Sequence, residues 1–337
     1  MMLVERQWIV VCAIAIFAGL RAVHADEPRA RTLEYTPTSK AWVEVLLPAP
    51  GTSEGDLHEI RMWIKDENYR SARWAIDKFV ERYGEQSEFY AAVLLAKAEL
   101  LIGQRRFYKA HQLLQEFLGE FGGGSLTGEA LRLEFVIAET YFTGVKRKLW
   151  GFRILSGVDI AHAILDDISV NYSETPFAAY AIKAKADYLF ANGDHALAEF
   201  EYARLLKDYP NSQYQQYALR RSAEAALASF AGVEYDDSAL IEAEERYRHY
   251  LAQYGAIATR EGVDLIIENI RERRADKLFV IGEYYERTNH LTSAAHSYRL
   301  VGALWPDSLA AGKAASRLGL LGATASVAAG AGTQQGG

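Results

Sequence analysis

Seven histidines lie beyond residue 25, and histidine is the side chain that most often binds a catalytic metal or moves a proton near neutral pH. None of them stands in a His-Glu-x-x-His sequence, the spacing that places two metal ligands on one helix face. The residues are His58, His111, His162, His195, His249, His290 and His296. His290 and His296 are only six positions apart, but a turn is expected between them. We interpret the histidines as surface residues and expect no metal cofactor.

A glycine-rich segment at residues 123–130 has the spacing of a phosphate-binding loop, with Gly123 and Gly128 at its glycine positions. Such a loop needs a lysine and then a serine or threonine after the second glycine. Glu129 and Ala130 occupy those positions. A carboxylate would repel phosphate, so we interpret this segment as a flexible connection between two helices.

The sequence also shows no recognisable arrangement of residues for nucleophilic or carboxylate catalysis. The sequence lacks Gly-x-Ser-x-Gly, and its single cysteine, Cys12, lies in a segment that we expect to be removed. Adjacent carboxylates at positions 166–167, 236–237 and 244–245 are spread over helix faces and loops, as solvation of a helical protein requires. We therefore predict a protein that is not an enzyme.

Aromatic and arginine side chains, which anchor many protein interfaces, gather near the carboxyl end. We select Arg274, Tyr284, Arg287 and Arg299 as candidate partner-binding residues. The neighbouring Tyr285 and Tyr298 are expected to serve the core instead. A second cluster, residues 146–148 with Trp150, is either a solvated helix end or a patch that contacts a membrane surface.

Composition limits the classes of protein and partner. Half of the residues are hydrophobic and 12% are aromatic, which is too much for a disordered chain. The formal net charge of −7 opposes binding to nucleic acid, so we expect no such partner.

Both ends of the chain differ from its middle. Arg6, a fourteen-residue uncharged run and the small-residue pattern ending at Ala25 predict a secretory signal peptide at residues 1–25. Four of the seven prolines precede residue 51, which predicts an extended arm at residues 26–56, with residues 41–47 as one short strand or a clip anchored by Trp42. Residues 322–337 lack periodicity and predict a disordered tail.

Residues 57–321 contain a repeated helical pattern. An aromatic residue precedes a helix-breaking position six times, at spacings of 38, 51, 37, 45 and 51 residues. The residue eleven positions earlier is alanine every time, and the residues four and seven positions after it are large and apolar. These six alanines are Ala72, Ala110, Ala161, Ala198, Ala243 and Ala294. Positions 0, 4, 7 and 11 share one helix stripe, so a neighbouring helix can approach closely at the small residue.

Each pattern is expected to be the second helix of a hairpin. Upstream of Ala110, Ala198 and Ala294, a small residue followed three positions later by an apolar one marks the first helix, as in the tetratricopeptide repeat. We predict an all-α tetratricopeptide-repeat solenoid of about six helical hairpins, rather than an ordinary helical bundle. The spacings of 51 imply inserts near residues 146–152 and 257–269.

The second half of the chain resembles the BamD (YfiO) family of outer-membrane assembly lipoproteins. The resemblance covers roughly residues 60–320 and is strongest from residue 198 on, in residues 209–218, 234–238, 242–251, 278–287, 294–298 and 305–308. It implies a periplasmic scaffold of tetratricopeptide repeats that binds a BamA-like, POTRA-containing outer-membrane protein and unfolded β-barrel substrates. No lipid-accepting cysteine follows the apolar run, so such a protein would be soluble or held at the outer membrane by its partner. The alternative is a general periplasmic adaptor for envelope or cell-wall assembly, similar to the Tol-Pal coordinator.

Overall fold

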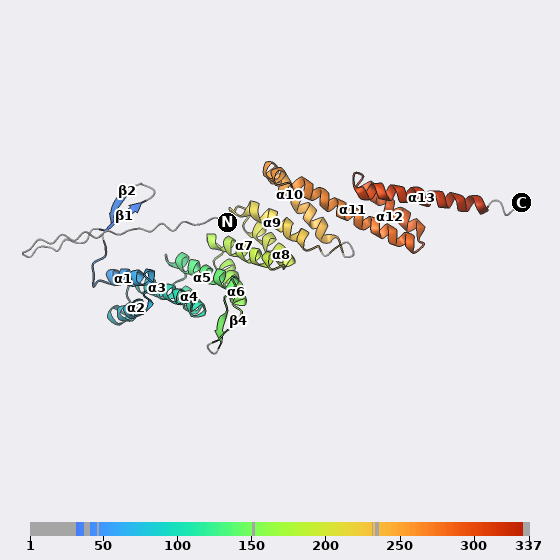
Figure 1. Ribbon diagram of the computed structural model, residues 1–337. Coiled ribbons are helices and arrows are strands. Elements are labelled where there is room, and N and C mark those ends of the chain that lie inside the picture. The colour runs from blue at the N-terminus through green and yellow to red at the C-terminus, as the bar shows by residue number, and fades with distance from the viewer. Residues whose placement is uncertain are drawn as a thin grey trace, which may run out of the picture.

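The computed structural model describes residues 32–36, 41–45, 47–149, 152–230, 232 and 236–332. The expected signal peptide at residues 1–25 lies outside these residues. Helices form nearly all of the described part, and they follow one another in a row from α1 at one end to α13 at the other (Figure 1). The prediction of an all-α solenoid is confirmed.

Twelve of the described helices form six successive hairpins, and α13 covers the last one. The hairpins are α1 (Ser53–Lys65) with α2 (Tyr69–Tyr83), α3 (Tyr90–Gly103) with α4 (Phe107–Phe121), α5 (Thr127–Phe142) with α6 (Val158–Asn171), α7 (Pro176–Ala191) with α8 (His195–Asp208), α9 (Gln215–Ala228) with α10 (Ser238–Arg260), and α11 (Val263–Arg287) with α12 (Leu291–Leu304). The covering helix α13 spans Leu309–Gly332. Extensive helix contacts join elements that are adjacent or next but one in the chain, as in a solenoid.

The predicted repeat positions form the core. All six alanines of the pattern have 0% exposed surface, and every residue four or seven positions after them is also buried. The small side chain lets the paired helix approach, and the larger ones fill the space where the helices diverge. Loss of one of these alanines to a larger residue would therefore separate two helices.

In four of the six hairpins the aromatic position breaks the second helix by a common backbone conformation, whereas Tyr83 and Phe121 are the last residues of α2 and α4 and a glycine caps each helix. Tyr172, Tyr209 and Trp305 are the C-cap residues of α6, α8 and α12, with φ between −123° and −136°. Tyr254 has the same conformation, φ −125° and ψ 35°, inside α10. The fifth hairpin therefore ends where the pattern predicts, and a short extra helical segment follows the break.

Two inserts account for the long spacings. Strands β3 (Arg147–Leu149) and β4 (Phe152–Leu155) form an antiparallel hairpin between α5 and α6. The second insert lengthens α11 to 25 residues. A solvated helix end at residues 146–148, one of the two interpretations above, is wrong, because this segment enters β3.

The segment before the solenoid contains a strand pair. Strand β2 (Ala41–Val45) matches the expected short strand, and it pairs antiparallel with β1 (Thr32–Thr36), which was not expected. Helix α1 begins at Ser53, four residues earlier than predicted. Thr52 caps it by accepting a hydrogen bond from the Gly55 amide at 3.1 Å.

The tail prediction requires correction. Residues 322–332 continue α13 instead of forming a disordered segment. Five of these eleven residues are alanine, the residue with the highest helix propensity, so the segment needs no apolar periodicity to remain helical.

Candidate partner-binding site

The last hairpin presents an apolar and cationic stripe on α11. Val280, Tyr284 and Arg287 lie at positions i, i+4 and i+7, so they share one helix face, which we call the α11 stripe. All three side chains are exposed, Tyr284 by 54%. The guanidinium carbon of Arg287 lies 5.8 Å from the centroid of the Tyr284 ring, which is within cation–π distance. The structure thus brings together two of the four residues selected from the sequence.

Arg274 belongs to a different environment. It is half-buried, its Nη1 atom donates to Glu244 Oε2 at 2.6 Å, and its guanidinium lies 5.3 Å from the Trp305 ring centroid. These contacts tie α10, α11 and the end of α12 together. Arg299 is exposed on α12, a different helix from the stripe. Arg274 is therefore a structural residue of the last two hairpins rather than part of the α11 stripe.

Glu244 is the centre of an arginine cluster that the sequence did not indicate. Its side chain is only 2% exposed, and it accepts contacts from Arg248 at 2.6 Å, Arg271 at 2.8 Å and Arg274 at 2.6 Å. Burial alone would raise the pKa of Glu244, but the hydrogen bonds from Arg271 and Arg274 outweigh it and hold the pKa below its ordinary value. The carboxylate therefore stays charged inside the protein.

A groove of about 870 Å³ lies beside this cluster, between the first part of α11 and the loop after α12. Exposed Leu265 and Leu304 lie at the groove together with the arginines and with Glu268, Glu272 and Asp307. Its charges nearly balance, so the groove has no strong preference for a charged ligand.

A second groove, of about 850 Å³, lies between the loop that joins α6 to α7 and the loop that joins α8 to α9. Tyr209 crosses from one loop to the other, and its hydroxyl donates to the Ser173 carbonyl at 3.1 Å. This bond fixes the separation of the two loops.

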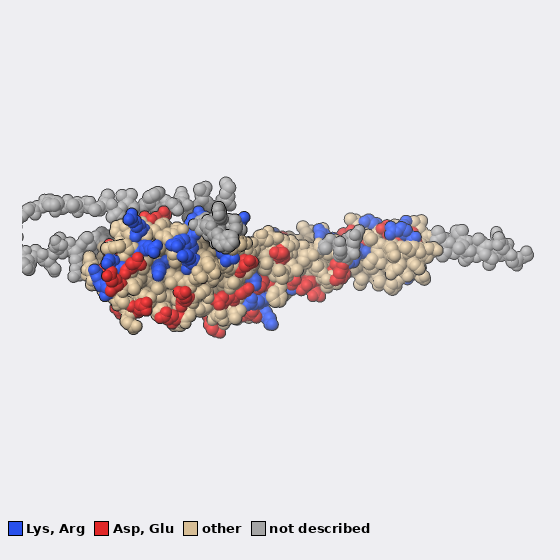
Figure 2. Space-filling view, turned by 90° about the horizontal axis from the view of Figure 1, so that it is seen from below, with Lys and Arg blue, Asp and Glu red and all other residues tan. Residues whose placement is uncertain are grey.

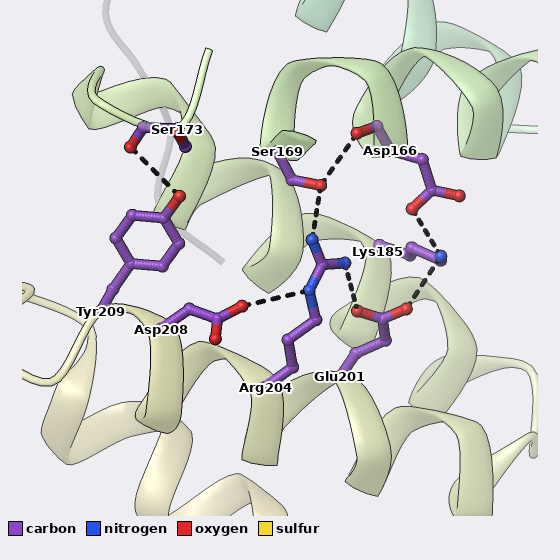
Figure 3. A network of polar contacts seen from close by, with 8 residues as sticks. All are labelled: Asp166, Ser169, Ser173, Lys185, Glu201, Arg204, Asp208 and Tyr209. Carbon is purple, nitrogen blue, oxygen red and sulfur yellow. Dashed lines mark hydrogen bonds and ion pairs between the residues drawn. The ribbon is translucent and has the colours of Figure 1, made fainter. Parts of the chain in front are cut away.

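A polar network lies next to that groove (Figure 3). Arg204 of α8 donates to Ser169 at 3.0 Å and to Asp208 at 3.3 Å. Lys185 of α7 bridges Asp166 at 2.7 Å and the buried Glu201 at 2.8 Å. Burial alone would lower the pKa of Lys185, but its hydrogen bonds to both carboxylates raise it. The network joins α6, α7 and α8, so these residues rigidify the solenoid.

Aromatic rings also form a row along the first helices of the central hairpins. Tyr180 of α7 lies 5.0 Å from the Phe135 ring and 6.1 Å from the Tyr214 ring. The Nζ atom of Lys183 lies 4.5 Å from the Tyr217 ring centroid. Phe135 is buried, whereas Tyr180, Tyr214 and Tyr217 are partly exposed, so these three rings offer surface that suits an extended peptide. We call Tyr180, Tyr214 and Tyr217, from α7 and the start of α9, the aromatic row.

Four histidines that we expected on the surface are half-buried: His58, His111, His162 and His195. His111 Nδ1 lies 2.9 Å from the carboxylate of fully buried Glu134. His162 lies edge-on to the rings of Phe142 and Tyr188, and burial lowers its pKa. Neither is part of a catalytic arrangement of the kinds considered above.

Within the described residues, no group of three or more His, Cys, Asp or Glu side chains could hold a metal ion. Nor is any helix there long and apolar enough to cross a bilayer. The surface view in Figure 2 shows Lys and Arg gathered over the N-terminal half of one face, with Asp and Glu mainly along its lower edge.

Comparison with known proteins gives a likeness to solved structures, and 40 chains match. No protein-family model matches the sequence, and no curated protein matches it. Among solved structures, the chain is similar to the C-terminal part of a TPR repeat-containing protein from Cytophaga hutchinsonii, at 12% identity, with 79% of this chain and 88% of that chain covered and a TM-score of 0.41. The assignment of the fold rests on the helical hairpins described above.

Proposed function

We propose that this protein is a non-catalytic scaffold that binds a partner protein through the α11 stripe. The observation that carries the proposal is the exposed, pre-arranged pair of Tyr284 and Arg287. Neighbouring exposed apolar side chains mark many interaction sites, and Tyr and Arg supply much of the binding energy at protein interfaces. Exposed Val280, one turn before Tyr284, extends the apolar part of the stripe.

The resemblance to the BamD family gives this scaffold a specific role. On this proposal the chain is exported to the periplasm and is associated with the outer membrane. There it binds a BamA-like, POTRA-containing protein and unfolded barrel substrates, and it assists insertion of β-barrel proteins. The support is the sequence resemblance of the second half together with the position of the α11 stripe in the last hairpin.

The aromatic row favours a second candidate function. The partly exposed rings on α7 and at the start of α9 suit an extended peptide better than a folded domain, as expected of a general periplasmic adaptor for envelope or cell-wall assembly. The two functions use different surfaces, so they can be separated by substitution.

The test is crosslinking followed by mass spectrometry of the protein at natural expression levels in its native envelope fraction. We expect a POTRA-containing barrel protein to crosslink to the last hairpin. The variant Y284A/R287E should reduce its recovery at least tenfold. A matched control, R73E/W74A, removes an exposed arginine and the 62% exposed Trp74 on α2, at the opposite end of the solenoid, and should leave recovery unchanged.

The outcomes separate the candidates. Recovery of cell-wall or Tol-Pal components through the aromatic row would favour the adaptor and exclude the role in barrel assembly. Equal loss in Y284A/R287E and R73E/W74A would exclude the α11 stripe as the binding surface.

A further inference from the structure

Two neighbouring turns of the solenoid carry basic residues and no acidic ones. Residues 104–115, at the turn from α3 to α4, contain three Arg or Lys residues and no Asp or Glu. Residues 143–158, between α5 and α6, contain four Arg or Lys residues and again no Asp or Glu. In a chain with a net charge of −7, this is a pronounced local reversal of sign.

The structure places the two turns against each other. The guanidinium carbon of Arg147, at the start of β3, lies 5.4 Å from the ring centroid of Tyr108 on α4. Arg147 also donates to the Ser156 carbonyl at 3.1 Å, which fixes it at the base of the hairpin. The basic edge, as we call this surface, comprises Arg105, Arg106, Lys109, Lys146 and Arg147; the first four are exposed, and Arg147 is half-buried.

Basic side chains elsewhere are commonly neutralised within the molecule. Lys183 contacts Asp187 at 2.7 Å, and Lys185 contacts two carboxylates. In the part of the chain that the structure describes, no residue of the basic edge makes an ion pair with a carboxylate. Four exposed positive charges and the half-buried Arg147 thus have no carboxylate partner among the described residues.

The β3–β4 hairpin beside the edge indicates what covers it. It extends beyond the helices (Figure 1), and its strands combine the basic residues Arg147, Lys148 and Arg153 with apolar Leu149 and Leu155. Basic residues interspersed with apolar ones are typical of segments that lie in the interface of an anionic membrane. An acidic protein partner would need the charge but not the apolar strand residues.

We propose that the basic edge binds the surface of a membrane rich in anionic phospholipid and holds the scaffold there peripherally. Each Lys or Arg close to such a surface strengthens binding about fivefold, so a few charges suffice for reversible attachment. The site is independent of the α11 stripe, which lies on the sixth hairpin.

Vesicle co-sedimentation tests the proposal. The protein is produced from its full gene, and its N-terminus is determined by mass spectrometry. Binding is measured on vesicles of 30% phosphatidylglycerol in phosphatidylcholine and on vesicles of phosphatidylcholine alone. We expect strong binding to the first kind only, and we expect it to weaken as salt rises from about 0.05 to 0.3 M because salt screens the charges.

The deciding variant is R106E/K109E/K146E. Arg106 is the N-cap residue of α4 and Lys109 lies in its first turn, where the helix dipole favours a negative charge, so folding should be preserved. The matched control K97E/K207E/R260E makes the same change in net charge at exposed positions elsewhere. We expect the variant to bind anionic vesicles about 100-fold more weakly and the control to stay within about threefold of wild type.

Three results would overturn the proposal. One is equal binding to both kinds of vesicle, and another is an equal loss in variant and control. The third is capture of an acidic protein by the basic edge without vesicle binding. The variant Y284A/R287E should bind vesicles normally, so failure of the partner-binding proposal and failure of this one are distinguishable.

Discussion

Gly282 of α11 lies directly against the ring of Tyr298 of α12: a Cβ atom at position 282 would come within 2.5 Å of Tyr298 Cε1. Tyr298 is fully buried, and its hydroxyl donates to Glu286 Oε2 at 2.8 Å, so the ring has no free direction in which to move. We predict that G282A lowers the free energy of unfolding by about 1 to 3 kcal/mol through overpacking. Urea denaturation followed by circular dichroism measures the change.

The control for this prediction is G302A on the facing helix. A Cβ at position 302 would meet no atom within 4 Å. Alanine at this exposed position of α12 should therefore raise the free energy of unfolding by up to about 1 kcal/mol. Destabilisation by G302A as large as that by G282A would contradict the packing argument.

Without the Glu244 carboxylate, the three arginines that contact it should repel one another. We expect E244Q to lower the free energy of unfolding by about 2 to 4 kcal/mol at pH 7, because three guanidinium groups lose their shared carboxylate. Since the folded-state pKa of Glu244 is lowered, its contribution is complete above the unfolded-state pKa and is lost as pH falls through the folded-state value. The difference between variant and wild type should therefore shrink below about pH 4. E245Q, at an exposed neighbour, should stay within about 0.5 kcal/mol of wild type.

Glu134 should show the opposite pH dependence. Burial raises its pKa, although its contact with His111 acts in the other direction. At position 134 the folded state then binds more protons than the unfolded state. The contribution of Glu134 to the free energy of unfolding therefore falls as pH rises above about 4.3. E134Q cannot titrate, and we predict that its stability relative to wild type increases between pH 4 and pH 7.5. A relative stability that decreases over this range would show that the contact with His111 dominates.

Helix α13 depends on a carboxylate from α11. Glu272 Oε2 accepts a hydrogen bond from the Leu309 amide at 3.0 Å, and Oε1 accepts one from the Ala310 amide at 3.1 Å, which caps α13 from outside the helix. We predict that E272A costs about 1 kcal/mol and speeds amide hydrogen exchange in α13 before other helices. E268A, one turn earlier and exposed, should leave exchange unchanged.

The solenoid was predictable because each hairpin solves the same packing problem. A close helix approach requires a small residue, and the requirement recurs at the same offset from the helix end, so six alanines such as Ala72 and Ala294 reveal it. Even the break inside α10 was predictable, because Tyr254 occupies the aromatic position of the repeated pattern. These signals are local in the sequence, which is why one sequence sufficed.

Features that depend on distant partners were not predictable. Glu244 and Glu245 look alike in the sequence, and only the arrival of Arg271 and Arg274 from the next helix makes Glu244 a buried ion-pair centre. Because Arg274 is engaged in these contacts, it does not belong to the α11 stripe. Tyr284 and Arg287, in contrast, share a helix face because of their spacing in the sequence alone. The β3–β4 hairpin was missed because the two residues between its strands, Trp150 and Gly151, do not match the Asn-Gly or Asp-Gly sequences that signal a tight hairpin turn.

The succession of helix contacts has a mechanical consequence. Within the described residues, the two ends of the row are connected through the intervening hairpins, so small rotations at each joint add up along the chain. The basic edge lies on the second and third hairpins, and the α11 stripe lies on the sixth. If the protein is attached to a membrane at the basic edge, bending of the solenoid changes the distance between the α11 stripe and the membrane. The stripe can then reach partners at different distances while the core of each hairpin stays intact.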